Sequence, residues 1–144
     1  MFDITVPRKE TWDELDDVPT EEVVKKVLRE FVKRLKKSEG ENLLKVVLFG
    51  SMARGDYDEE SDTDVFVLLR KGNSHGELGT RISTIAYETD ADICRCYTYT
   101  APFIETLEEL EERYPKKEYP NGYDFIPIFT SIAEEGVVLY DVEG

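Results

Sequence analysis

The sequence predicts an α/β domain of the α+β type, with a small mixed or antiparallel sheet backed by helices. The chain has 144 residues, a length that suits one domain with its own hydrophobic core. Its apolar residues follow helix and strand periods in the order helix, strand, strand, helix, strand, helix, helix. Ten residues separate Ser51 from Asp62. Because a parallel crossover usually takes more residues, we expect a hairpin-like connection between the first two strands.

The N-terminal residues, 1–19, show no sustained helical period, so we expect an irregular segment there and a core over residues 20–141. Apolar residues alternate before Pro7 and indicate a short edge strand at Phe2, Ile4 and Val6. Three further apolar residues are expected to pack onto the core: Trp12, Leu15 and Val18. Residues 1–144 are thus expected to form a single domain.

The first helix is expected to begin after Thr20 and to end at Gly40. Thr20 is a suitable N-cap, and Glu21 and Glu22 favour the helix N-terminus because acidic side chains there interact with the free amide groups. Glycine readily takes the left-handed conformation that closes many helices. The apolar residues with helical spacing are Val23, Val24, Val27, Leu28, Phe31, Val32 and Leu35.

Two strands, a loop and a short helix are predicted in the middle of the chain. Residues 43–49 and 64–69 are apolar runs rich in branched side chains, which is typical of buried strands. Residues 70–76 are polar and contain two glycines, and predict a loop. Residues 78–87 predict a helix, with inward side chains at Leu78, Ile82, Ile85 and Ala86.

The C-terminal part predicts a third strand and two more helices. The third strand is expected over residues 90–97, followed by a helix that Thr100 caps and that has a proline in its first turn. The last helix is expected from about Asp124 to Glu135, and residues 137–140 can add a terminal strand.

The charge balance argues against direct binding of nucleic acid. The chain has 32 acidic and 18 basic residues, a net charge of -14 and a pI near 4.5. Nucleic-acid binding draws much of its affinity from basic side chains that neutralise phosphates. An acidic face for a basic protein partner and a well-solvated surface both fit this composition. We expect no membrane segment and a cytoplasmic location, because the chain has no long apolar run and no signal-peptide pattern at its start.

Asp62 and Asp64 predict a metal site. Residues two apart on a strand point to the same face, where two carboxylates repel each other and each raises the pKa of its neighbour. A divalent cation reverses this repulsion. Mg²⁺ in particular binds through one or two carboxylates together with substrate phosphates. The pair is therefore favourable when a metal–nucleotide binds.

Gly50 and Ser51 predict the phosphate-binding half of the same site. A glycine at the end of a strand lets a ligand approach the backbone, and the Ser51 hydroxyl and the following amides can donate to phosphate oxygens. The next residues, up to Gly55, have the composition of a short helix. Arg54 adds a positive charge for the nucleotide, or it forms an ion pair with a neighbouring acid such as Asp56.

This stretch, FGSMARGDYDEESDTDVFVLL, resembles the polymerase-beta nucleotidyltransferase superfamily. Gly50-Ser51, ten residues and Asp62-Thr63-Asp64 match the Gly-Ser-x10-Asp-x-Asp signature of that superfamily. The Phe-Gly-Ser-x-Ala-Arg-Gly and Ser-Asp-x-Asp segments resemble its minimal nucleotidyltransferase branch, and so does the closing segment IAEEGVVLYD at Ile132–Asp141. The order of predicted elements extends the likeness over residues 20–141.

The resemblance implies the polymerase-beta-like fold and the transfer of a nucleoside monophosphate from ATP or another NTP to a hydroxyl. It implies that Gly50 and Ser51 hold the triphosphate and that Asp62 and Asp64 bind two Mg²⁺ ions. A third catalytic carboxylate is expected on the neighbouring strand. Asp92 and Asp90 are the candidates, and we favour Asp92 because it leads into the apolar run ICRCY.

The resemblance also implies a partner, because minimal nucleotidyltransferases resemble antitoxins paired with small helical HEPN-type toxins. Some of them adenylylate a tyrosine of that toxin. The small chain would then act as a protein adenylyltransferase whose acceptor pocket is completed by the partner or by a second copy in a homo-oligomer. Two alternatives stay open: an antitoxin that neutralises its partner by contact alone, and an enzyme that modifies small molecules of the aminoglycoside type.

Overall fold

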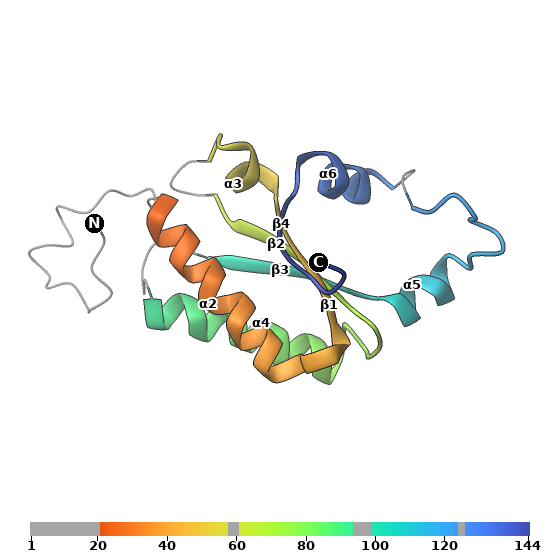
Figure 1. Ribbon diagram of the computed structural model, residues 1–144, viewed down its shortest axis with the longest axis horizontal. Helices are drawn as coiled ribbons and strands as arrows, with labels where there is room; N and C mark the ends of the chain where they lie inside the picture. Colours follow the sequence, from red (N-terminus) through yellow and green to blue (C-terminus); the bar gives the residue numbers. More distant parts are fainter. Residues whose placement is uncertain (1–20, 58–60, 94–98, 124–125) are drawn as a thin grey trace, which may run out of the picture.

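A computed structural model of the protein describes residues 21–57, 61–93, 99–123 and 126–144. Its helices and strands alternate around one small sheet (Figure 1). In chain order they are α2 Glu21–Glu39, a 3-10 turn Gly40–Asn42, β1 Leu43–Phe49, α3 Gly50–Arg54, β2 Thr63–Leu69, α4 Glu77–Ile93, β3 Thr100–Thr106, α5 Leu107–Arg113, α6 Pro127–Glu135 and β4 Val137–Asp141.

The sheet is mixed, which confirms the predicted fold class. Its strand order is β3-β2-β1-β4, with β1 antiparallel to both β2 and β4, and with β2 parallel to β3. The hairpin-like link between β1 and β2 is confirmed as well, since these strands pair from Leu43 opposite Leu69 to Phe49 opposite Asp64. Among the described residues, no helix is long and apolar enough to cross a membrane.

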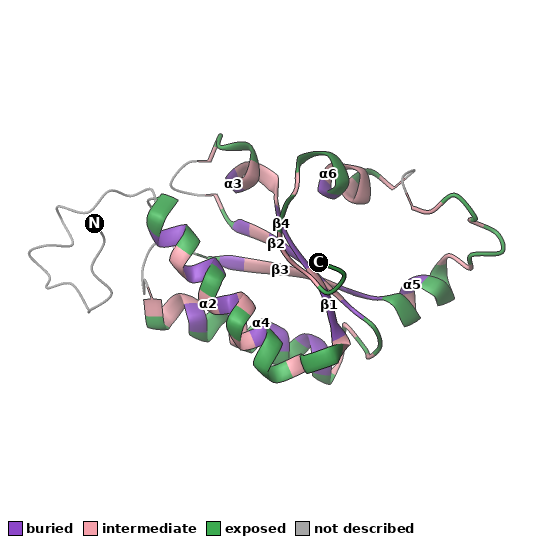
Figure 2. Ribbon diagram, in the orientation of Figure 1, coloured by how far each residue is buried: buried purple, intermediate pink, exposed green. Residues whose placement is uncertain are grey.

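Helices α2 and α4 cover one face of the sheet, and α6 lies on the other (Figure 1). The first helix has the predicted bounds, and the inner stripe of α2 is buried (Figure 2). It packs on the β1 and β2 side chains that point to the same face. Thr20, the predicted N-cap, lies outside the described residues. Fully buried members of this core include Val27, Phe31, Leu35, Leu43, Val46, Val65, Val67, Leu69 and Ile82.

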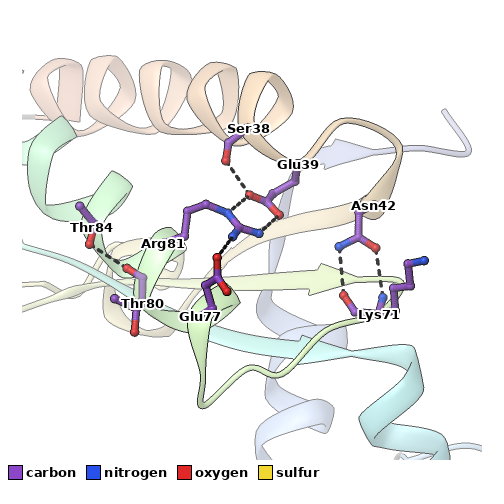
Figure 3. A network of polar contacts seen from close by, with 8 residues as sticks. All are labelled: Ser38, Glu39, Asn42, Lys71, Glu77, Thr80, Arg81 and Thr84. Atoms are coloured by element: carbon purple, nitrogen blue, oxygen red, sulfur yellow. Dashed lines mark hydrogen bonds and ion pairs between the residues drawn. The ribbon is translucent and has the colours of Figure 1, made fainter.

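Polar contacts fasten the two helices to each other at the end of α2 (Figure 3). The Arg81 guanidinium donates to both carboxylate oxygens of Glu39, at 2.8 and 2.9 Å. This bidentate contact lowers the pKa of the Glu39 carboxyl, whose side chain is only 3% exposed. Nearby, the Asn42 amide pairs with the backbone N–H and C=O of Lys71, at 3.1 and 3.0 Å. These contacts join α2 to α4 and close the end of the β1–β2 pair.

The structure corrects the prediction for residues 90–97 and for the helix after Thr100. Helix α4 runs on to Ile93, so residues 90–93 are helical, and residues 94–98 lie outside the described ranges. The third strand is instead Thr100–Thr106. Pro102 suits the first turn of a helix and also an edge strand, where its missing N–H costs no ladder bond. These residues form a strand and not a helix, because β3 pairs with β2 along its whole length.

The elements after β3 agree in part with the prediction. Thr106, and not Thr100, caps a helix here, and its hydroxyl accepts a hydrogen bond from the amide of Glu109 at 3.0 Å. Helix α6 ends before Gly136, as predicted, but it begins at Pro127 and not near Asp124, because Ile126 is extended; residues 124–125 lie outside the described ranges. The terminal strand is confirmed as β4 at an edge of the sheet.

The placement of Asp90 makes the first testable prediction. Its carboxylate accepts from the backbone N–H and the hydroxyl of Thr100, at 2.7 and 2.9 Å, and thereby holds the start of β3. Thr100 is only 4% exposed. Asp90→Ala should lower the free energy of unfolding by about 1–3 kcal/mol, because it leaves a buried donor without its partner.

The matched control is Asp92→Ala, two residues further along α4. Asp92 pairs with Arg34 at 2.9 Å, but its side chain is 59% exposed. Such a surface pair contributes about 0.2–1 kcal/mol. Urea unfolding followed by circular dichroism compares the variants, and equal losses would contradict the tether at Thr100.

Candidate active site

The candidate active site lies where β1 ends and β2 begins. Phe49, the last residue of β1, pairs with Asp64 of β2, and Gly50 follows directly as the first residue of α3. Along β2, Val65 and Val67 point into the core beneath α2 and α4, whereas Phe66 packs with Ile132 of α6 on the other face. Because side chains alternate along a strand, Asp64 shares the face of Phe66, and Asp62 lies at the same edge.

Gly50 is held against the carboxylate of Asp64. Its φ of 75° is in the left-handed region, which residues with a side chain rarely adopt. A Cβ at this position would also collide with the Oδ2 atom of Asp64. The chain therefore needs glycine here for two independent reasons, and the result is a backbone turn in close approach to a carboxylate.

Ser51 lies in the first turn of α3. This helix is short, and Gly55 closes it with a φ of 84° and an N–H donated to the Ser51 carbonyl at 2.9 Å. The N-cap residue, Phe49, has no polar side chain that could bind the first amides of α3. The Gly50–Ser51 turn therefore offers backbone N–H groups and a hydroxyl to an anion beside Asp64.

The electrostatics of the site are set by two carboxylates and one guanidinium. Burial is the main cause that raises the pKa of Asp64, and the negative charge of Asp62 raises it further. The Arg54 charge acts in the opposite sense. A bound cation would remove the repulsion between the carboxylates, and the donor set of two carboxylates fits Mg²⁺ that reaches its full coordination with phosphates and water.

Arg54 connects α3 to α6. Its guanidinium lies 3.2 Å from a carboxylate oxygen of Asp56 and 3.2 Å from one of Glu135, and the Ser131 hydroxyl donates to the same Glu135 carboxylate at 3.2 Å. The predicted ion pair with Asp56 is thus present. Sequence reasoning missed Glu135 and Ser131, because they lie some eighty residues away and carry no motif.

The structure does not bring the predicted third carboxylate to a strand beside Asp64. Asp90 and Asp92 are both on α4, where Asp90 binds Thr100 and Asp92 binds Arg34. Opposite Asp64 on β3 stands Ala101. Within the described ranges, no group of three or more His, Cys, Asp or Glu side chains is placed to hold a metal ion. The expected placement of Asp90 and Asp92 on a strand is therefore wrong, because the polar segment before the apolar run extends α4.

An apolar groove lies on the same sheet face, where its floor includes Val47, Phe66 and Leu68. Its cavity volume is about 320 Å³. Two aromatic rings of its wall, Phe66 and Phe129, lie 6.1 Å apart in an edge-to-face arrangement, and the Tyr123 ring lies 6.0 Å from the Phe129 ring at a tilt of 46°. The sequence carried no pattern that grouped these residues, since they come from β2, α6 and the loop before it. The groove follows β2 from Phe66 toward the end of the strand, and so offers an apolar surface on the face that Asp64 shares.

Comparisons with known proteins agree on one family. The model of the family described as "Nucleotidyltransferase domain" matches residues 25–126. A protein of Methanocaldococcus jannaschii named "Putative protein adenylyltransferase" is 31% identical over 116 residues, which cover 80% of this chain and 96% of that protein. A second protein of that name and organism is 49% identical over 45 residues, 31% of this chain and 46% of its own length.

A solved structure shows the same fold. Spectinomycin adenyltransferase from Enterococcus faecialis, solved with ATP and spectinomycin, matches with a TM-score of 0.55 and 17% identity. The match covers 86% of this chain and 57% of the other. At this identity the likeness concerns the arrangement of helices and strands alone.

The close approach at Gly50 can be tested by substitution. Gly50→Ala should destabilise the protein by about 1–2 kcal/mol through the left-handed backbone, and further because the new Cβ must displace the Asp64 carboxylate. Gly55→Ala is the matched control, because Gly55 has a similar φ of 84° but open space where its Cβ would lie. Thermal unfolding measures both, and equal effects would contradict the contact with Asp64.

The pKa of Asp64 predicts a pH-dependent stability. Because this pKa is raised in the folded protein, the folded state binds the proton more tightly than the unfolded chain, whose Asp pKa is about 3.9. Stability should therefore fall as the pH rises through the interval between the two values, and stay lower above it.

Asp64→Asn should for this reason stabilise the metal-free protein at neutral pH and lose that advantage in acid. Asp62→Asn should give part of the gain, since it removes only the neighbouring charge. Urea unfolding in a chelating buffer from acid to neutral pH measures the difference. A constant loss of stability in Asp64→Asn at every pH would contradict the argument.

Proposed function

The chain belongs to the nucleotidyltransferase domain family, and on this premise we propose that it transfers AMP from ATP to a hydroxyl of a protein partner. We propose further that residues 1–144 work as one such domain in the cytoplasm. The observation that carries the proposal is the Asp64 carboxylate seated against the Gly50 backbone, with Asp62 at the same edge. This contact supports the proposal, because nucleotidyl transfer needs metal-binding carboxylates close to groups that can donate hydrogen bonds to phosphate oxygens.

Each residue of the site takes a role that its position supports. Asp62 and Asp64 would hold Mg²⁺, and a pair of ions fits the reaction. The Gly50–Ser51 turn would bind the triphosphate through its amides and the Ser51 hydroxyl. Arg54, whose positive charge already acts on Asp64, would add a contact to the phosphates if it left Asp56 or Glu135. Mg²⁺ supplies charge stabilisation at the transferring phosphoryl group.

A protein acceptor is supported by three observations. The relative that aligns over most of both chains is named a putative protein adenylyltransferase. The net charge of -14 suits a basic protein and not a polyanion. An apolar groove with aromatic walls lies further along the sheet face that carries Asp64 and can accept part of a protein partner. We propose that the acceptor is a tyrosine of a small helical HEPN-type toxin, and that the protein acts as its antitoxin.

The carboxylate pair is the part of the site to test first. The purified protein is incubated with α-labelled ATP, Mg²⁺ and the product of the neighbouring gene, which is the expected partner. Radiolabel should then appear on that partner. Asp62→Ala/Asp64→Ala should lose this label by at least 100-fold, because general positioning and charge stabilisation at the phosphates are lost together. Label transferred to an aminoglycoside instead of the partner would support a small-molecule enzyme.

Two further readouts separate the alternatives. Neutralisation of the partner that survives Asp62→Ala/Asp64→Ala would support an antitoxin acting by contact, and failure to bind any Mg²⁺–NTP would remove the enzymatic proposal. Asp92→Asn decides the role predicted for Asp92. A loss of Mg²⁺-dependent activity as large as that of Asp62→Asn would make Asp92 a metal ligand, and full activity would leave it as the partner of Arg34.

A further inference from the structure

A second apolar groove lies away from the candidate active site, between the first half of α2, the back of α3 and the free edge of β4. Its cavity volume is about 280 Å³. An adjoining hollow of about 240 Å³ continues it along α2. Val137, at the edge of β4, is 47% exposed although it is large and apolar. The apolar wall of the groove consists of Val24, Leu28, Leu48, Met52, Val137 and Leu139.

The rim of this groove carries two basic side chains beside one acidic side chain, Glu21, whereas acidic residues outnumber basic ones in the chain as a whole. Lys25 and Arg29 line it from successive turns of α2, and Lys36 lies further along the same side, 5.2 Å above the Tyr140 ring of β4. Lys25 also forms a 3.0 Å pair with Glu21, but both side chains are well exposed, and such pairs contribute little. In a chain of net charge -14, this rim selects a ligand that is both apolar and acidic.

Such a segment exists in the chain itself, directly before α2. We propose that residues 10–18, ETWDELDDV, occupy this groove in the same molecule. They lie outside the residues that the structure describes and outside the match to the family, which begins at residue 25. The apolar members of the segment are Trp12, Leu15 and Val18, and its acidic members are Glu10, Asp13, Glu14, Asp16 and Asp17.

The position of the segment favours binding within one molecule. Glu21 lines the groove, and only Pro19 and Thr20 separate it from Val18. A short tether of this kind gives an effective concentration in the millimolar range, so a modest contact suffices for occupancy. The apolar side chains would fill the groove beside Leu28 and Met52, while the acidic side chains would meet Lys25 and Arg29.

The inference does not depend on the proposed transfer reaction, but it bears on the candidate site. Met52, Ala53 and Tyr57 line the groove from α3 and the turn after it. The same helix begins with Gly50 and Ser51 on its other side. A segment bound in the groove would therefore support the helix that carries the phosphate-binding turn.

Trp12 makes the proposal directly measurable, because it is the chain's only tryptophan. In the full-length protein its fluorescence should be shifted to the blue and quenched several-fold less by acrylamide than in urea-unfolded protein. Lys25→Glu/Arg29→Glu should shift the emission to the red and increase quenching, since the acidic segment then faces like charges. Lys33→Glu/Lys37→Glu is the matched control, with the same charge change on exposed α2 residues outside the groove, and should leave the emission unchanged.

Three outcomes would overturn the proposal. Emission of the unaltered protein that already equals that of the unfolded chain would show Trp12 in water. Equal effects of the two double variants would show a general response to charge. A blue shift that disappears on dilution together with a dimer in size-exclusion chromatography would show that a second copy supplies the segment. Far-UV circular dichroism confirms that each variant is folded, so that a red shift reports undocking and not unfolding.

Discussion

The contact between the Asp64 carboxylate and the Gly50 backbone is the constraint on which the candidate site depends. It exists only because β1 and β2 pair in a register that sets Phe49 opposite Asp64. A shift by one residue would turn Asp64 toward the core beneath α2 and α4. The left-handed turn at Gly50 then starts α3 at the same edge, so one register fixes the carboxylates, the turn and the short helix together.

This arrangement lowers the stability of the ligand-free protein, and the unfavourable interactions lie within the site. Burial and the charge of Asp62 both disfavour the ionised form of Asp64, while Arg54 offsets only part of this effect. Arg54 is itself shared with Asp56 and Glu135, so that among the described residues it offers the carboxylate pair only part of a counter-charge. Sites that are strained in the free protein and relaxed by a ligand are common where function and stability compete. The hydrophobic core around Phe31 and Leu35 is fully buried, and its burial offsets this loss of stability.

Local patterns in the sequence predicted the elements that build the site. They failed where a contact with a residue further along the chain determines the local structure. The helical stripe of α2, the apolar strands β1 and β2, and the spacing from Gly50-Ser51 to Asp62-x-Asp64 are all contained in neighbouring residues. The end of α4 is not, because the polar residues around Asp90 can begin a strand or end a helix, and the contact of Asp90 with Thr100, ten residues further on, has no local signal. The contact from Arg54 to Glu135 spans most of the chain and has no local signal.

The two faces of the sheet differ: one carries most of the hydrophobic core, and the other carries the candidate site. On one face, α2 and α4 bury the large aliphatic residues and are joined to each other by the bidentate contact of Arg81 with Glu39. On the other face, α6 covers only part of the sheet, and a groove remains along Phe66 and Leu68. The second face thus combines a smaller buried cluster, around Val47, Phe66 and Ile132, with an open groove. If the proposed function holds, we expect α6 and the groove beside it to determine which acceptor binds. The strands β1 and β2 would then determine the catalytic geometry.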